Sequence, residues 1–155
     1  MSTLTEPTNA PAATRKVDQL LANYGESHRN PTNELIHYVA IPLIILSLLG
    51  MLYALHPWVA YGFIALSMVY YVHLASPVFM VAMAVQSAIA MALVFAMGSL
   101  VLPISVGIFV AAWIAQFVGH KIDGKKPSFF EDLQYLLVGP LFVLSKLFQR
   151  LGIRW

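Results

Sequence analysis

One continuous stretch of 86 residues, from Leu35 to His120, contains no Lys, Arg, Asp or Glu. Its residues are mostly Leu, Ile, Val, Ala, Met and Phe. No element of a soluble core is that long, whereas a bilayer core about 30 Å thick needs roughly 20 helical residues for each crossing. The stretch therefore predicts a membrane protein with several helical crossings, because a helix satisfies its own backbone polar groups in lipid.

Proline and glycine divide this stretch into four segments of membrane-spanning length. The breaks fall at His56-Pro57, Ser76-Pro77 and Gly98-Ser99, and the segments cover residues 36–55, 58–75, 78–97 and 100–117. Because the breaks are so short, neighbouring helices must be antiparallel. The predicted fold is all-α, a bundle of four transmembrane helices, and alanines spaced by four at 84, 88, 92 and 96 predict close packing of the third.

The flanking segments complete the predicted domain organisation. Residues 1–14 are polar and Pro-rich, lack the apolar segment of a signal peptide and predict a disordered tail. Residues 15–155 then form a single membrane domain, which opens with a short amphipathic helix over 15–23. Asn30 followed by Pro31 predicts the start of the first crossing helix. Residues 131–148, interrupted at Gly139-Pro140, predict an interfacial or re-entrant helix rather than a fifth crossing.

The basic residues predict the orientation in the membrane. Arg15, Lys16 and Arg29 precede the uncharged stretch, and Lys121, Lys125 and Lys126 follow it. Four crossings place both flanks, and so both termini, on the cytoplasmic side. No basic stripe interleaved with aromatics is present, so nucleic-acid binding is set aside. The lipid bilayer is the expected surrounding, and self-association into a homo-oligomer stays open.

The predicted topology also assigns each of the five histidines to one side of the membrane. His28, His37, His73 and His120 fall at the cytoplasmic edge, whereas His56 falls on the opposite side. Convergence of His28, His37 and His120 would give a site of three nitrogen ligands with open positions, suited to Fe(II) or Zn(II), and His73 is a further candidate ligand. The absence of cysteine excludes thiolate ligands. The alternative is that these rings simply lie among the lipid headgroups.

Gln116 stands four residues before His120 and therefore shares its helix face. A glutamine in that position is suited to holding a ring N–H or a bound water. Gln116 is accordingly a candidate support for a metal ligand.

Two motifs carry a resemblance to a known family. The first is Tyr24-x3-His28-x-Asn30-Pro31-x-Asn33-x2-Ile36-His37, followed by Ile41-Pro42. The second is Trp113-Ile114-x-Gln116-Phe117-Val118-Gly119-His120, followed by Pro127 and Gly139-Pro140. Over about residues 24–148 the chain resembles the membrane 2-hydroxy fatty acid dioxygenases, long catalogued as a domain of unknown function. The middle helices match only in hydrophobicity.

The resemblance implies an Fe(II)-dependent enzyme that uses O₂ to shorten a 2-hydroxy fatty acid by one carbon, the α-oxidation reaction of phytosphingosine degradation. By motif match it implies that His28, His37 and His120 hold the iron. Tyr24, Asn30 and Asn33, which belong to the first motif, are candidate supports for those ligands. Family members usually carry Glu four residues after the last histidine and Pro eight residues after it. Here Asp123 follows at three and Pro127 at seven, which makes Asp123 the candidate catalytic carboxylate.

Two other classes of function remain open from the residues alone. A b-type haem carrier needs two imidazoles at matching depth on facing helices, and His37 with His73 is the only good pair. A catalytically silent membrane adaptor is favoured if the region of Asp123 has decayed. An optical spectrum separates the enzyme from the haem carrier, because haem gives an intense Soret band and mononuclear non-haem iron does not.

Overall fold

The computed structural model describes residues 15–26, 30–74, 76–124 and 135–155. This part of the chain is helical and contains no strand, which confirms the all-α prediction. The predicted tail over 1–14 lies outside the described residues. The elements are α1 (Lys16–Glu26), α2 (Pro31–Leu55), α3 (Pro57–His73), α4 (Pro77–Ala96), the short 3₁₀ helix η1 (Gly98–Leu100), α5 (Val101–Ile122) and α7 (Val138–Leu151).

Local chemistry sets both ends of α2. The Asn30 side-chain oxygen accepts a hydrogen bond from the Thr32 N–H at 2.9 Å, and Pro31 takes the first helical position. At the other end only His56 separates α2 from α3, and its Nδ1 accepts from the Trp58 N–H at 3.3 Å. The predicted helix start at Asn30 and the predicted break at His56 are therefore confirmed.

Three stretches are long and apolar enough to cross a bilayer: α2, α4, and η1 together with α5. The fourth predicted crossing, α3, has 17 residues and reaches about 26 Å at 1.5 Å per residue. The described residues thus form a helical membrane protein with three candidate spans. The fourth crossing and the side on which the termini lie remain predictions.

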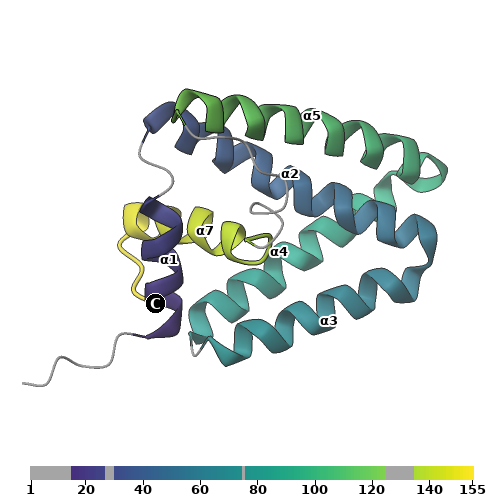
Figure 1. Ribbon diagram of the computed structural model, residues 1–155. Helices are drawn as coiled ribbons and strands as arrows, with labels where there is room; N and C mark the ends of the chain where they lie inside the picture. The colour runs from purple at the N-terminus through teal and green to yellow at the C-terminus, as the bar shows by residue number, and fades with distance from the viewer. Residues whose placement is uncertain (1–14, 27–29, 75, 125–134) are drawn as a thin grey trace, which may run out of the picture.

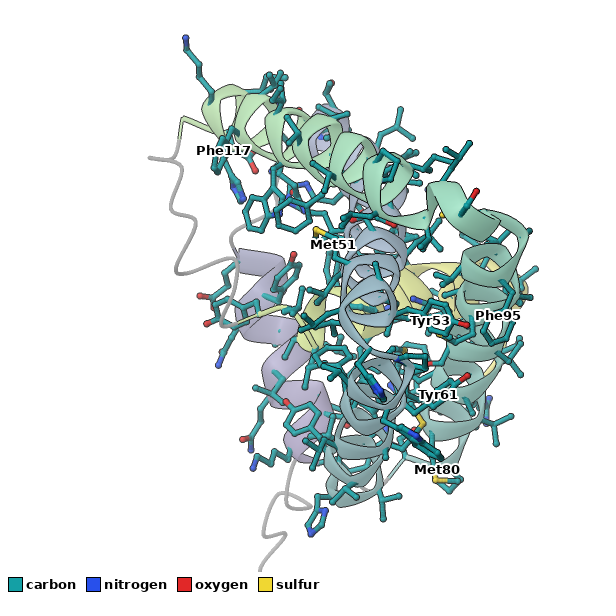
Figure 2. The ribbon with its side chains drawn as sticks, turned by 90° about the vertical axis from the view of Figure 1, so that its right-hand side faces the viewer. Met51, Tyr53, Tyr61, Met80, Phe95 and Phe117 are labelled. Carbon is teal, nitrogen blue, oxygen red and sulfur yellow. The ribbon has the colours of Figure 1, made fainter. Side chains whose placement is uncertain are left out.

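Helix α2 is the centre of the bundle and contacts α3, α4, α5 and α7. Its most extensive contact is with α5, which runs beside it along one edge of the molecule, while α3 and α4 lie on the other side (Figure 1). Helices α1 and α7 contact each other at the end of the bundle where α2 begins and α3 and α5 end (Figure 1). At the opposite end, Tyr53 of α2 packs edge-on against Phe95 of α4, with ring centroids 5.4 Å apart (Figure 2).

The structure corrects the prediction for the C-terminal helix. Gly139-Pro140 does not interrupt a helix, because α7 begins at Val138 and both residues lie in its first turn. Proline is tolerated there, since the first turn has no partner for its missing N–H. Residues 131–134 of the predicted segment lie outside the described residues. With 14 residues, about 21 Å, α7 is too short to cross a bilayer.

Close helix packing occurs between α2 and α5, and the prediction for the alanines of α4 is wrong. A Cβ added to Gly50 would overlap Ser105 Oγ, and one added to Gly119 would overlap Asn33 Oδ1. Glycine at these two positions therefore lets the two backbones approach. The α4 alanines are exposed instead: Ala84, Ala88, Ala92 and Ala96.

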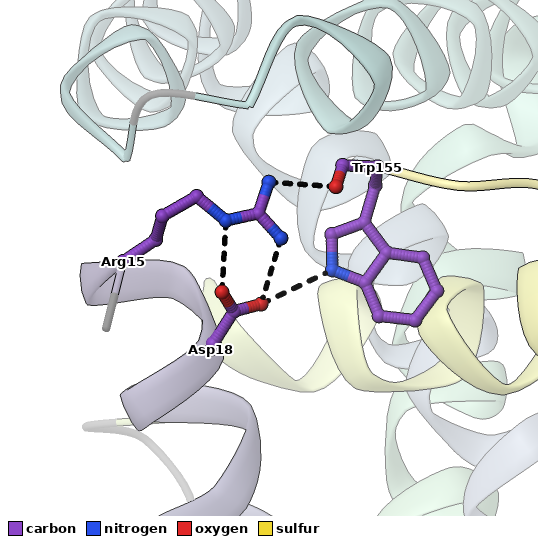
Figure 3. A network of polar contacts seen from close by, with 3 residues as sticks. All are labelled: Arg15, Asp18 and Trp155. Atoms are coloured by element: carbon purple, nitrogen blue, oxygen red, sulfur yellow. Dashed lines mark hydrogen bonds and ion pairs between the residues drawn. The ribbon is translucent and has the colours of Figure 1, made fainter. Parts of the chain in front are cut away.

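A polar network joins Trp155 to α1 (Figure 3). The Arg15 guanidinium donates to the Asp18 carboxylate at 2.8 and 3.1 Å and to the Trp155 carbonyl oxygen at 2.6 Å. The Trp155 indole N–H donates to Asp18 at 3.3 Å, and its ring packs on Phe79 of α4 and Phe148 of α7. This network links the amphipathic helix α1 to α4 and α7.

Candidate functional site

Two of the predicted ligands, His37 of α2 and His120 of α5, lie side by side. Their ring centroids are 5.1 Å apart and their planes meet at 82°. His37 is fully buried and His120 is 7% exposed. Buried imidazoles require polar partners, so the pair marks a polar site inside an otherwise apolar bundle.

A backbone carbonyl orients the His37 ring. Its Nδ1 lies 2.9 Å from the carbonyl oxygen of Asn33, one turn earlier on α2. Because a carbonyl oxygen only accepts, Nδ1 carries the proton in the neutral ring and Nε2 carries the lone pair. Metal-binding histidines are commonly oriented in this way, with Nε2 as the ligand.

Asp123, the candidate catalytic carboxylate, joins the end of α5 to the start of α2. Its Oδ1 accepts from the Asn30 backbone N–H at 2.9 Å, and its Oδ2 accepts from Asn33 Nδ2. Both carboxylate oxygens are thus bound to α2, close to the helix N-terminus, where the helix dipole favours a negative charge. In this geometry Asp123 holds the two helices, and with them the two histidines, in register.

Two buried amide oxygens at this end of the bundle have no hydrogen-bond partner among the described residues. They are Asn33 Oδ1, on a fully buried residue, and Gln116 Oε1, on a residue only 4% exposed. Leaving a buried acceptor unsatisfied costs about 1–3 kcal/mol. Such oxygens favour the binding of a donor or a cation. Gln116 lies one turn before His120 on α5, as predicted.

Gln116 also lines a small cavity of about 20 Å³, which has room for one water molecule. Tyr24 lines the same cavity from α1, and its ring contacts Tyr135 and Phe142 at centroid distances of 5.5 and 5.0 Å. The remaining lining residues are largely apolar: Ile41, Ile44, Trp113, Leu136 and Gly139.

Gly119 is a site residue whose role sequence reasoning missed, although it belongs to the second motif. Its backbone lies against the Asn33 side chain, and an added Cβ would come within 3.5 Å of His37 Cε1. A glycine within a membrane helix is a signal that a neighbouring helix can approach closely at that position. Gly119 thus allows α5 to bring His120 up to His37.

Neither of the other two predicted ligands is found beside this pair in the described part of the chain. His28 lies outside them. His73 is exposed on α3, and its Nδ1 lies 2.7 Å from the Val69 carbonyl oxygen of its own helix. No group of three or more His, Asp or Glu side chains able to hold a metal ion occurs in the described part of the chain. His37 with His73 is also not the matched buried pair that a haem carrier needs.

These features define a class: a small helical membrane protein with a buried histidine pair held by polar contacts between two helices. Residues 14–151 match the family model described as 2-hydroxy-palmitic acid dioxygenase Mpo1-like. The chain therefore belongs to the Mpo1-like family, as its two motifs indicate. The 2-hydroxy-palmitic acid dioxygenase MPO1 of Saccharomyces cerevisiae is 29% identical over 138 residues, which cover 85% of this chain and 79% of that relative. No solved structure matches the chain.

Proposed function

We propose that this protein is a 2-hydroxy fatty acid dioxygenase that shortens its substrate by one carbon. Membership of the Mpo1-like family and the name of the curated relative support the reaction class. The single observation that supports a location for this reaction is the buried pair of His37 and His120. The Asn33 carbonyl oxygen orients the His37 ring of this pair.

The donor groups at this site fit Fe(II). Two imidazoles lie together, and the Asn33 and Gln116 amide oxygens nearby lack a partner among the described residues. His37 and His120 would hold the ion, with His28 as the third ligand by motif match. Bound iron would supply redox chemistry with O₂ and open positions for substrate oxygens.

The reaction breaks the bond between C1 and C2 of the 2-hydroxy acid. C1 leaves as CO₂, C2 becomes the carboxyl carbon of the shorter acid, and O₂ accepts the electrons with formation of one water. A 2-hydroxy acid offers a hydroxyl and a carboxylate as neighbouring oxygen ligands. An unsubstituted fatty acid offers only the carboxylate and should react less well.

The position of the site suits a lipid substrate. His37 lies near the start of α2 and His120 near the end of α5, at one end of the apolar bundle (Figure 1). A fatty acid there can keep its tail in hydrocarbon while its polar head reaches the site. The cavity beside Gln116 has room for a water or O₂ and is too small for an acyl chain.

Replacing each histidine by alanine tests the site. We expect His37→Ala and His120→Ala to lose bound iron and the conversion of a long-chain 2-hydroxy acid. His56→Ala and His73→Ala, which remove imidazoles outside the pair, are the matched controls and should retain both. Full iron retention in His37→Ala or His120→Ala contradicts the site.

Two further measurements separate the alternatives. Replacing Fe(II) by redox-inert Zn(II) should preserve the fold and abolish turnover. An intense Soret band from the purified protein would instead indicate haem. Iron-loaded protein that consumes no 2-hydroxy acid of any chain length would favour a membrane adaptor.

We also propose four crossings with both termini in the cytoplasm. The support is the confinement of every Lys and Arg to the two flanks of the uncharged stretch. Reporter fusions at the two ends should report the same side of the membrane. Opposite sides would mean an odd number of crossings, with α3 failing to span.

A further inference from the structure

A second pocket lies between α2 and α7, and none of its lining residues belongs to the histidine pair. Its volume is about 190 Å³, and Tyr38 of α2 lines it opposite four residues of α7. Along the helix these four alternate between apolar and basic side chains: Val143, Lys146, Leu147 and Arg150. Lys146 and Arg150 are four residues apart, so both cations project from the same face of α7.

The two cations of this pocket differ in whether a carboxylate forms an ion pair with them. Lys146 Nζ lies 3.2 Å from Glu34 Oε1, and the Tyr38 hydroxyl donates to the same carboxylate. Arg150 lies over the Tyr38 ring, 5.6 Å from its centroid, and forms no ion pair with a described residue. Glu34 also interacts electrostatically with Arg150, so among the described residues two positive charges share one negative charge. The described part of the pocket therefore keeps an excess positive charge, and Arg150 is the cation without a direct ion pair there.

Apolar side chains stand beside this excess charge. Leu147 is 47% exposed although it is large and apolar, and Val143 is half-buried one turn earlier on α7. A small soluble anion would contact only the cation. An amphiphile would contact both the cation and the apolar side chains, with its acidic head at Arg150 and its chain along Leu147. Basic pockets between the helices of membrane proteins bind anionic lipid heads in this way.

We propose that the pocket between α2 and α7 binds an anionic phospholipid. Its phosphate lies against Arg150, and an acyl chain lies along Val143 and Leu147. Because the pocket is lined from both helices, the bound lipid ties α7 to the start of α2. The occupant is a structural ligand, separate from the proposed fatty acid substrate, and the proposal does not depend on the enzymatic activity.

Lipid retention by the full-length protein tests this proposal. The protein is placed in nanodiscs of phosphatidylcholine alone, of phosphatidylcholine with phosphatidylglycerol, or of phosphatidylcholine with palmitic acid, and the lipid retained is counted by native mass spectrometry. We expect preferential retention of phosphatidylglycerol and a higher unfolding temperature in its presence. Arg150→Gln should weaken that retention by about fivefold, the effect of one cation at a membrane surface.

Arg154→Gln is the matched control, because it removes the same charge from an exposed position that does not line the pocket. It should retain phosphatidylglycerol as the unchanged protein does. Equal retention of phosphatidylglycerol and phosphatidylcholine by the unchanged protein would overturn the proposal, as would equal losses in the two arginine variants. If Arg150→Gln loses only palmitic acid, the pocket binds a fatty acid carboxylate and the phospholipid proposal is wrong.

Discussion

The contact between α2 and α5 has two ends with the same backbone arrangement and different chemistry. Toward one end Gly50 of α2 faces Ser105 of α5, and toward the other Gly119 of α5 faces Asn33 of α2. At each place a glycine lets the partner helix approach so closely that a Cβ would overlap a polar side chain. Only the second place lies beside the histidine pair.

The polar groups at the two ends differ in whether they are satisfied. Ser47 Oγ donates to the Ile44 carbonyl oxygen at 2.9 Å, and Ser105 Oγ lies 3.9 Å from Met97 Sδ. Beside Gly119, Asn33 Oδ1 and Gln116 Oε1 have no hydrogen-bond partner within the described ranges. Close approach of α2 and α5 is therefore a feature of helix packing and does not by itself indicate a binding site. The buried oxygens without a protein partner distinguish the end where we propose that an ion or water binds.

Gly119→Ala should have the largest effect, because it acts on the end that carries the histidines. The added methyl group displaces Asn33, which holds both Asp123 and the His37 ring. We expect loss of bound iron and a fall of about 2 kcal/mol in the free energy of unfolding. Gly50→Ala is the matched control and should cost similar stability while iron stays bound. Equal iron content in the two variants would remove the functional difference between the ends.

Asp123→Asn separates a positioning role from a catalytic one. The amide keeps one acceptor oxygen but presents an NH₂ group to the Asn33 donor, so we expect the free energy of unfolding to fall by about 2 kcal/mol. Turnover per folded, iron-loaded molecule should be largely kept. Unchanged unfolding with abolished turnover would instead make Asp123 a catalytic group.

Gln116→Leu and Ser47→Ala should change stability in opposite directions. The Gln116 amide oxygen is buried and has no partner among the described residues, so replacing this side chain by an apolar group of similar size removes a desolvation cost. In the metal-free protein Gln116→Leu should therefore gain about 1 kcal/mol, while the iron-loaded protein loses activity. Ser47→Ala removes a hydrogen bond that is already satisfied and should lose about 1 kcal/mol with activity kept. Thermal unfolding of both variants in the same detergent measures the difference. A loss of stability in metal-free Gln116→Leu would show that a bound water satisfies this oxygen when the ion is absent.

Asp18→Asn should have the smallest effect, since it acts on the exposed network at Trp155 (Figure 3). Ion pairs in contact with solvent contribute less than about 1 kcal/mol and weaken with salt. We expect a small decrease in unfolding temperature that disappears at high salt, with iron content unchanged. A loss of iron would connect α1 to the histidine site more closely than its contacts indicate.

Local features of this protein could be predicted from sequence because they depend on neighbouring residues. Asn30 and Pro31 start α2, Pro57 starts α3, and Gln116 shares a helix face with His120. Each follows from capping or from the helical repeat. The partners of Asp123 could not be found in this way, because they lie 93 and 90 residues away along the chain.

The sequence by itself determined that the chain is a helical membrane protein, because 86 uncharged and largely apolar residues have no other stable environment. Its motifs also indicated the family. Only the tertiary structure decided which histidines meet. His37 and His120 come together because glycine lets α2 and α5 approach at that depth, while His73 remains exposed on α3. Helix phase is a local property, but contact between two helices depends on how their surfaces pack.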